Sequence, residues 1–109
     1  MNRELMKKWI AALRSGEYAQ GKDYLYHPDE NGDEAYCCLG VLQAIEPRIE
    51  QNHDGDEILD DASLAEFLGV GLGDGFDQTR YAHMNDQGVR FPHIADVLES
   101  EWLEQEAAP

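Results

Sequence analysis

Residues 36–42 read YCCLGVL, the least polar run in the chain, and they contain both of its cysteines. The next residues, QAI, extend this run, so that Leu39, Leu42 and Ile45 recur at helical spacing until a proline ends the pattern. The stretch therefore predicts a buried helix over 38–45, and the rest of the fold has to cover it.

The adjacent thiols of Cys37 and Cys38 allow four interpretations: a reactive pair, a disulfide, part of a metal site, or two small apolar residues. A disulfide between neighbours closes a strained ring, and zinc sites usually space paired cysteines about two to four residues apart. A reactive thiolate needs an electropositive setting, whereas the sequence around this pair is acidic. We expect two buried structural thiols, and we expect Gly40 to allow the close approach of a neighbouring helix.

The chain before this run predicts one helix and one hairpin. Asn2 can cap a helix over about 3–15, and a glycine follows its last turn. Asn-Gly between two tyrosine-containing segments is a strong hairpin signal, which predicts antiparallel strands near 23–27 and 34–37.

The chain after this run predicts three further helices. A short helix should lie in LAEFLGV, capped by Asp61 or Ser63, before the glycine-rich connector GLGDGFD. A helix over about 78–86 should stop at Gly88, and the last helix carries Pro92 in its first turn. The expected fold is α+β and mainly α: four to five short helices packed with a small antiparallel β-hairpin. It forms one domain over 1–109, with a frayed tail from about 104.

Charge is the strongest compositional feature. The 109 residues hold 23 acidic and 8 basic side chains, a net charge of −15, while a 42% hydrophobic content argues against disorder. The excess is concentrated: residues 28–61 hold eleven acidic side chains and one basic, whereas 1–27 hold three and five. Such a chain repels nucleic acid and anionic membranes and is attracted to basic protein surfaces.

Several familiar sites are not supported by the sequence. The acidic stretch DENGDE lacks the register of an EF-hand, and GVGLGDG lacks the Gly-Lys-Ser/Thr ending of a phosphate loop. The histidine–carboxylate pairs His83/Asp86 and His93/Asp96 read as solvated helix surface rather than metal ligands. We expect no cofactor, no metal and no catalytic residue.

Three blocks of the sequence occur together in a known pattern: WIAALRSGEYAQG (9–21), CCLGVL (37–42) and MNDQGVRFPHIADVLE (84–99). The chain thereby resembles a family of small, uncharacterised phage and prophage proteins. The resemblance implies a shared core and a phage origin, and it assigns no catalytic residue. The acidic segment 43–61 and the tail lie outside the blocks, which is where specificity for a partner would then lie.

From charge and resemblance together, we expect a non-enzymatic, phage-encoded inhibitor that binds a basic nucleic-acid-binding surface of a host defence effector, of anti-CRISPR or anti-restriction type. The mechanism would be nucleic-acid mimicry, in which carboxylates occupy phosphate positions. The expected acidic interface comprises Asp29, Glu30, Asp33, Glu34, Asp54, Asp56, Glu57, Asp60 and Asp61. The candidate aromatic anchors are Tyr24, Tyr26, Phe76 and Tyr81.

Two other classes of function remain open at this stage: a small metal-dependent or thiol hydrolase, and a phage structural or accessory protein. The expected location is the cytoplasm of the host bacterium, because no export signal or membrane span is recognisable. The expected partner is a basic host protein, with no direct nucleic acid or membrane contact. The sequence is also compatible with a homodimer.

Overall fold

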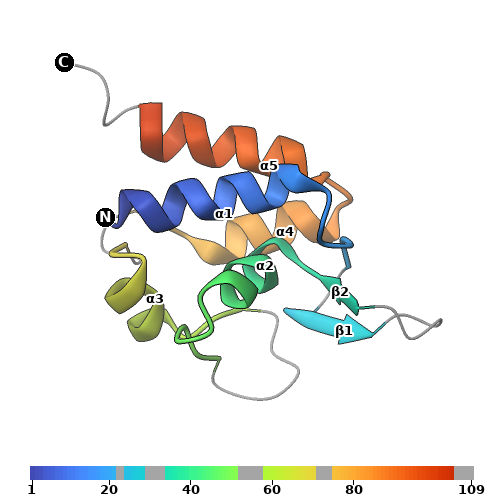
Figure 1. Cartoon of the computed structure of the whole chain (residues 1–109), viewed down its shortest axis with the longest axis horizontal. Coiled ribbons are helices and arrows are strands. Elements are labelled where there is room, and N and C mark those ends of the chain that lie inside the picture. The colour runs from blue at the N-terminus through green and yellow to red at the C-terminus, as the bar shows by residue number, and fades with distance from the viewer. Residues whose placement is uncertain (22–23, 29–33, 52–57, 71–74, 105–109) are drawn as a thin grey trace.

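The structure is a computed structural model that describes residues 1–21, 24–28, 34–51, 58–70 and 75–104. These residues form a mainly helical fold with a small two-stranded sheet, as expected (Figure 1). The helices are α1 (Arg3–Ser15), α2 (Cys38–Ile45), α3 (Asp61–Phe67), α4 (Gln78–Asp86) and α5 (Phe91–Leu98), which the π-helix η2 (Glu99–Glu104) continues. The strands are β1 (Tyr26–Pro28) and β2 (Glu34–Tyr36).

Helix α1 begins and ends where the sequence predicts. The Asn2 side chain accepts a hydrogen bond from the backbone N–H of Leu5 at 3.1 Å, and Gly16 ends the helix with a left-handed φ of 77°. Asn2 also reaches the end of α3, where its backbone N–H donates to the carbonyl of Leu68 at 2.7 Å. The buried face of α1 consists of Leu5, Met6, Trp9, Ile10 and Leu13.

The helices enclose one core. Helix α5 lies along α1, and α2 and α4 pack on the other side of that pair, with α3 and the strands at opposite ends (Figure 1). Phe76, directly before α4, packs its ring against three others: the ring centroids lie 6.2 Å from Trp9, 5.2 Å from Tyr81 and 5.4 Å from Trp102. The first and last helical segments therefore meet at a single aromatic cluster.

The small sheet differs from the expected simple hairpin. β1 and β2 pair antiparallel, with Tyr26 opposite Tyr36, but Gln20 adds a parallel bridge to Tyr36 from the other side. The backbone N–H of Gly21 donates to the carbonyl of Tyr36 at 2.7 Å, so the chain leaving α1 covers the open edge of β2. The strands are also shorter than predicted, and the Asn-Gly turn between them lies outside the described residues.

The YCCLGVL stretch forms the predicted buried helix. Cys37 caps α2, its sulfur accepting from the N–H of Gly40 at 3.4 Å, and the Cys38 thiol donates to the carbonyl of Tyr81 at 3.5 Å. Both thiols are fully buried and unbridged, and burial raises the pKa of Cys38 well above its usual value. The pair is part of the scaffold.

Replacing both Cys37 and Cys38 with alanine is expected to lower the free energy of unfolding by about 1–3 kcal/mol, because small cavities and one capping contact are left behind. Urea denaturation followed by circular dichroism measures this loss. The folded double variant should retain any partner binding. A well-folded variant that no longer binds would indicate that a thiol takes part in function.

Gly40 approaches the backbone of another segment, which corrects the expectation of a neighbouring helix. A Cβ atom at this position would overlap the carbonyl oxygen and carbon of Leu25, just before β1. The same carbonyl oxygen accepts a hydrogen bond from the N–H of Cys37 at 3.2 Å. Helix α2 is thus held against the strand segment without an intervening side chain.

The three sequence blocks meet in this core. The indole N–H of Trp9, in the first block, donates to the carbonyl of Cys38, in the second, at 2.8 Å. The Gln20 amide donates to the side-chain oxygen of the fully buried Asn85 at 3.0 Å, and Asn85 donates to the carbonyl of Gly21 at 2.7 Å. The blocks therefore correspond to contacts that fix the fold.

The third and fifth helices differ in detail from the sequence prediction. α3 begins at Asp61, earlier than LAEFLGV implies, because Asp60 rather than Asp61 or Ser63 is its cap. The carboxylate of Asp60 accepts from the N–H of Ser63 at 3.0 Å. α5 changes to π-helical hydrogen bonding after Leu98, whereas α4 ends before Gly88 as predicted.

Candidate acidic binding surface

Three of the nine predicted interface carboxylates lie in the described part of the chain. Asp60 and Asp61 lie at the N-terminus of α3, and Glu34 lies in β2, at the other end of the molecule. The remaining six lie outside the described residues: Asp29, Glu30, Asp33, Asp54, Asp56 and Glu57.

Two further carboxylates, Glu50 and Glu66, join Asp60 and Asp61. The segment before α3 is tied to the helix by two hydrogen bonds: the N–H of Glu50 donates to the Ser63 hydroxyl at 2.9 Å, and the N–H of Asp60 donates to the carbonyl of Glu50 at 2.8 Å. Glu50, Asp60 and Glu66 line a shallow depression of about 260 Å³. We call Glu50, Asp60, Asp61 and Glu66 the α3 acidic surface.

Arg48 is the basic side chain beside this surface, and its charge is already compensated. Its guanidinium donates to both carboxylate oxygens of Glu46, at 2.7 and 2.8 Å, and lies 4.7 Å from the centre of the Phe67 ring. These hydrogen bonds lower the pKa of Glu46 to about 2. The arginine is therefore held by its own neighbour and leaves the α3 acidic surface net negative.

The Glu46–Arg48 pair should make stability depend on pH at the acid end. The pKa of Glu46 is lowered to about 2 from 4.5, so the pair stabilises the fold above pH 4.5, and this contribution is lost as the pH falls towards 2. The difference in free energy of unfolding between the wild type and Glu46→Gln should shrink over that range in urea titrations. Glu17→Gln, at an exposed position, is the control. A difference between wild type and Glu46→Gln that does not change with pH would contradict this assignment.

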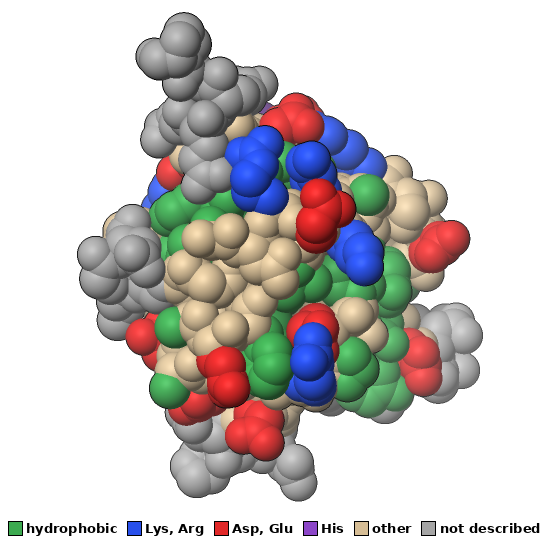
Figure 2. All heavy atoms as spheres, turned by 60° about the vertical axis from the view of Figure 1, so that its left-hand side comes forward, with side chains coloured by type: hydrophobic (Ala, Val, Ile, Leu, Met, Phe, Trp, Pro, Cys, Tyr) green, Lys and Arg blue, Asp and Glu red, His purple; other side chains and the backbone are tan. Residues whose placement is uncertain are grey.

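Other arginines are also held by intramolecular carboxylates. Arg14 contacts Asp96 at 2.7 Å and Glu99 at 3.1 Å, and Arg80 contacts Glu101 at 2.6 Å. On the face shown in Figure 2, basic side chains gather towards the top and acidic ones predominate towards the bottom. Pairing of the arginines leaves the surplus of carboxylates exposed to solvent or to a partner.

The four candidate aromatic anchors divide into two pairs. Tyr24 and Tyr26 are 42% and 45% exposed, as an anchor requires. Phe76 and Tyr81 are buried, which corrects the prediction: Phe76 lies in the core directly before α4, and Tyr81 faces it from α4. The indole N–H of Trp102 donates to the Tyr81 hydroxyl at 3.0 Å, so this polar group also has an internal partner.

The sequence prediction included Glu34 and Tyr26 but missed Tyr36 and Tyr18 beside them. The hydroxyls of Tyr26 and Tyr36 donate to its two carboxylate oxygens at 3.4 and 3.2 Å, and the Tyr18 ring packs edge-on against Tyr36. The pairing of β1 with β2 places Tyr36 opposite Tyr26, which the prediction of two paired, tyrosine-containing strands could have indicated.

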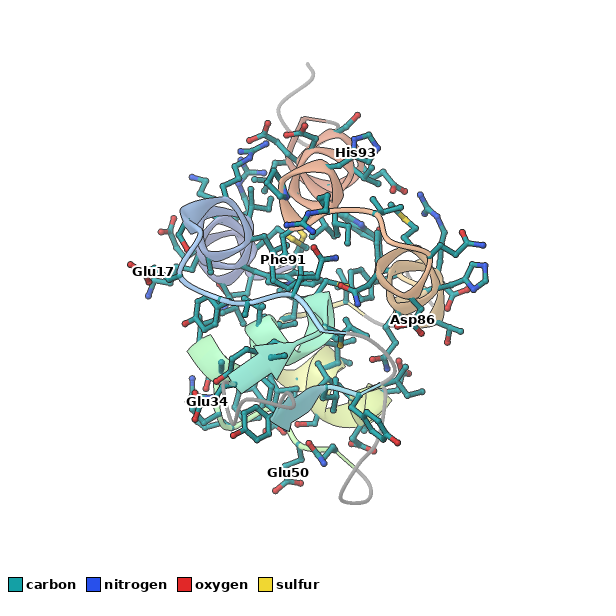
Figure 3. All side chains as sticks on the ribbon, turned by 90° about the vertical axis from the view of Figure 1, so that its right-hand side faces the viewer. Glu17, Glu34, Glu50, Asp86, Phe91 and His93 are labelled. Carbon is teal, nitrogen blue, oxygen red and sulfur yellow. The ribbon has the colours of Figure 1, made fainter. Side chains whose placement is uncertain are left out.

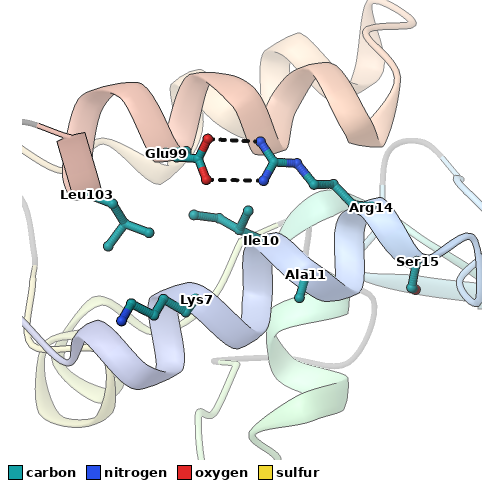
Figure 4. Close-up of a pocket in the computed structure, with 7 residues that line it drawn as sticks. All are labelled: Lys7, Ile10, Ala11, Arg14, Ser15, Glu99 and Leu103. Carbon is teal, nitrogen blue, oxygen red and sulfur yellow. Dashed lines mark hydrogen bonds and ion pairs between the residues drawn. The ribbon is translucent and has the colours of Figure 1, made fainter.

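A larger apolar groove lies between α1 and η2 and contains none of the predicted residues. Its volume is about 540 Å³, and Ile10 and Leu103 line it. Figure 4 shows the Arg14–Glu99 pair at one end of the groove and Lys7 towards the other. The hydrogen bonds that the Arg14 guanidinium donates to Glu99 and Asp96 raise its pKa.

Among the residues that the structure describes, no three histidine, cysteine or carboxylate side chains are grouped so as to hold a metal ion. None of the described helices has the length and apolarity needed to cross a bilayer.

The described chain is thus a small, mainly helical α+β protein with an acidic surface at α3. It belongs to a family defined by a domain of unknown function, DUF8296, whose model matches residues 1–63. The match includes the first two sequence blocks and ends inside α3, before the third block. Comparisons with curated proteins and with solved structures gave no match to this chain.

Proposed function

We propose that this protein is a non-enzymatic inhibitor that binds the basic, nucleic-acid-binding surface of another protein. The observation that carries the proposal is the α3 acidic surface in a chain of net charge −15. The neighbouring Arg48 does not neutralise this surface, because it is paired with Glu46. Arginine and lysine side chains that normally contact phosphates pair equally well with carboxylates. The inhibitor would therefore occupy the site of the nucleic acid.

Long-range electrostatics supports fast association with such a target. Attraction between a strongly acidic protein and a basic groove raises association rates by about 10- to 1,000-fold at low salt. Helix α1 carries four basic side chains and one acidic, whereas the α3 acidic surface is negative, and this asymmetry would orient the acidic part towards the groove.

The biological setting is part of the proposal. We infer a phage or prophage origin and action in the host cytoplasm from the resemblance of the three sequence blocks. The target class would then be a host defence effector, such as a CRISPR complex or a restriction enzyme. The family itself has no assigned function, so the target has to be found by experiment.

A retention experiment with matched charge variants tests the proposal. The wild type is immobilised and exposed to nuclease-treated bacterial lysate at low and high salt, and a short DNA duplex is added as competitor. The variant Asp61→Asn/Glu66→Gln removes two charges from the α3 acidic surface. The control variant Glu4→Gln/Glu17→Gln removes two exposed charges at α1.

We expect retention of nucleic-acid-binding proteins that weakens as salt rises and that DNA abolishes. The α3 variant should retain several-fold less than the control variant. Retention that DNA does not displace, or equal retention by both variants, would contradict mimicry through this surface. Stoichiometric zinc in the purified protein would favour the metal-dependent alternative instead.

A further inference from the structure

A cluster of tyrosines surrounds Glu34 at the end of the molecule opposite α3. Tyr24 and Tyr26 face outward from the segment leading into β1, while Leu25 between them is buried. Tyr24 and Tyr26 are two of the three large hydrophobic side chains that are exposed in the described part of the chain. Exposed tyrosines are enriched at protein interfaces, and Tyr26 is the one that contacts the Glu34 carboxylate.

Glu34 is oriented but retains the capacity to bind. Its Oε1 accepts from the Tyr26 hydroxyl at 3.4 Å and its Oε2 from the Tyr36 hydroxyl at 3.2 Å. Both distances exceed the usual O–H···O separation, and within the described part of the chain these are the hydrogen bonds to this carboxylate, so that each oxygen keeps a second lone pair for an incoming donor. Partial desolvation, followed by the nearby Glu34 carboxylate, raises the pKa of both tyrosines. Their hydroxyls therefore stay protonated and act as donors.

The rings beside this carboxylate are fixed by one another. The Tyr26 and Tyr36 centroids lie 5.3 Å apart at 53°, and Tyr18 meets Tyr36 at 5.4 Å and 84°. Tyr36 is therefore held on two sides, while Tyr26 keeps 45% of its surface exposed. The result is an aromatic surface of mutually packed rings with an oriented negative charge at its edge.

We propose that Tyr26, Glu34 and Tyr36 form a docking surface for an arginine side chain of a basic protein partner. This inference rests on the proposed function, which supplies a basic partner. The inference adds the contact that would anchor this partner. The guanidinium would donate two parallel hydrogen bonds to the Glu34 carboxylate while its plane stacks on the exposed face of Tyr26. Charge complementarity selects this occupant, because the chain carries −15 overall.

Arginine fits this surface better than lysine does. Its planar, weakly hydrated guanidinium can contact a ring face and a carboxylate simultaneously, whereas a lysine ammonium offers a single, strongly hydrated charge. The surface therefore discriminates between two side chains of equal charge. Simple attraction to an acidic protein would not do so.

Two peptides of equal length and charge test the inference: an arginine–glycine repeat and a lysine–glycine repeat, titrated into isotopically labelled full-length protein at near-physiological salt. Tyrosine ring chemical shifts give the site, and the titration gives the dissociation constant. Glu34→Gln removes the charge, Tyr26→Leu removes the ring, and Tyr26→Phe keeps the ring. Glu17→Gln is the matched control, because its carboxylate points away from Glu34 (Figure 3).

The arginine peptide is expected to bind about 3- to 10-fold more tightly than the lysine peptide and to shift the Tyr26 and Tyr36 rings. Glu34→Gln and Tyr26→Leu should weaken it about 5- to 10-fold, and Tyr26→Phe and Glu17→Gln less than about 2-fold. Unchanged melting temperatures exclude unfolding as the cause.

Equal affinity for both peptides, or equal loss in Glu34→Gln and Glu17→Gln, would overturn the inference. Mimicry would survive that result if lysate retention still depended on the α3 acidic surface. Conversely, arginine selectivity at Glu34 without retention of any nucleic-acid-binding protein would contradict the proposed function and leave the arginine surface in place.

Discussion

Replacing Gly40 with alanine is expected to destabilise the protein by more than about 3 kcal/mol or to prevent folding. The new methyl group would overlap the backbone carbonyl of Leu25, and backbone cannot rotate away as a flexible side chain can. Relief would require separating α2 from the strand segment, which would also break the hydrogen bond between the N–H of Cys37 and the same carbonyl.

Helix propensity alone predicts that Gly40→Ala stabilises the protein. Gly40 lies inside α2, where alanine is favoured over glycine by about 1 kcal/mol. Thermal unfolding followed by circular dichroism therefore separates the two effects. Gly88→Ala is the control: nothing lies within 4 Å of its Cβ position, and the strain at its φ of 92° should cost about 1–2 kcal/mol. A melting temperature for Gly40→Ala at or above that of the wild type would show that the close approach is not maintained.

A chain consisting of residues 1–63 alone is expected not to fold, although the family model ends there. Its buried side chains would lose their partners: Trp9 would lose the Phe76 ring, and the Cys38 thiol would lose the carbonyl of Tyr81. Helix α1 would also lose α5, which covers its apolar face. The remaining apolar residues are too few to offset the conformational entropy of ordering the chain.

The truncated chain should show no cooperative thermal transition and little dispersion of amide proton shifts in NMR spectra. A chain of residues 1–104 is the control, because it keeps every contact described above and should unfold cooperatively. Cooperative unfolding of residues 1–63 would mean that the matched segment is an independent domain. The expected result means instead that the family's structural unit extends beyond the matched residues.

Local signals predicted the helices well where several of them agreed. For α1, the Asn2 cap, the apolar spacing and Gly16 all indicate the same limits, and the structure has them. For α3, two adjacent aspartates and a serine offered alternative caps, and only the hydrogen bond from Ser63 to Asp60 selects one. Part of the reason is not local in sequence, because the Ser63 hydroxyl accepts from the N–H of Glu50, 13 residues earlier in the chain.

The surface was harder to predict than the helices, for a physical reason. An aromatic residue beside a glycine-rich connector reads as exposed, yet Phe76 is buried because α1 and η2 bring two tryptophans to it from distant parts of the chain. The parallel bridge of Gln20 to Tyr36 likewise forms between segments that are separated in the sequence. For the candidate site, charge indicated Asp60 and Asp61, whereas Glu50 and Glu66 join them only through the folded backbone.

The packing of Trp9 and Trp102 against Phe76 provides an optical reporter of the fold. These are the only two tryptophans in the sequence, one in the first helix and one in the last helical segment. Both indoles pack against the same phenylalanine and donate internal hydrogen bonds. When the two ends of the chain separate, both indoles lose these contacts and become exposed to water. A shift of intrinsic emission to longer wavelength therefore measures directly whether the two ends of the chain are held together.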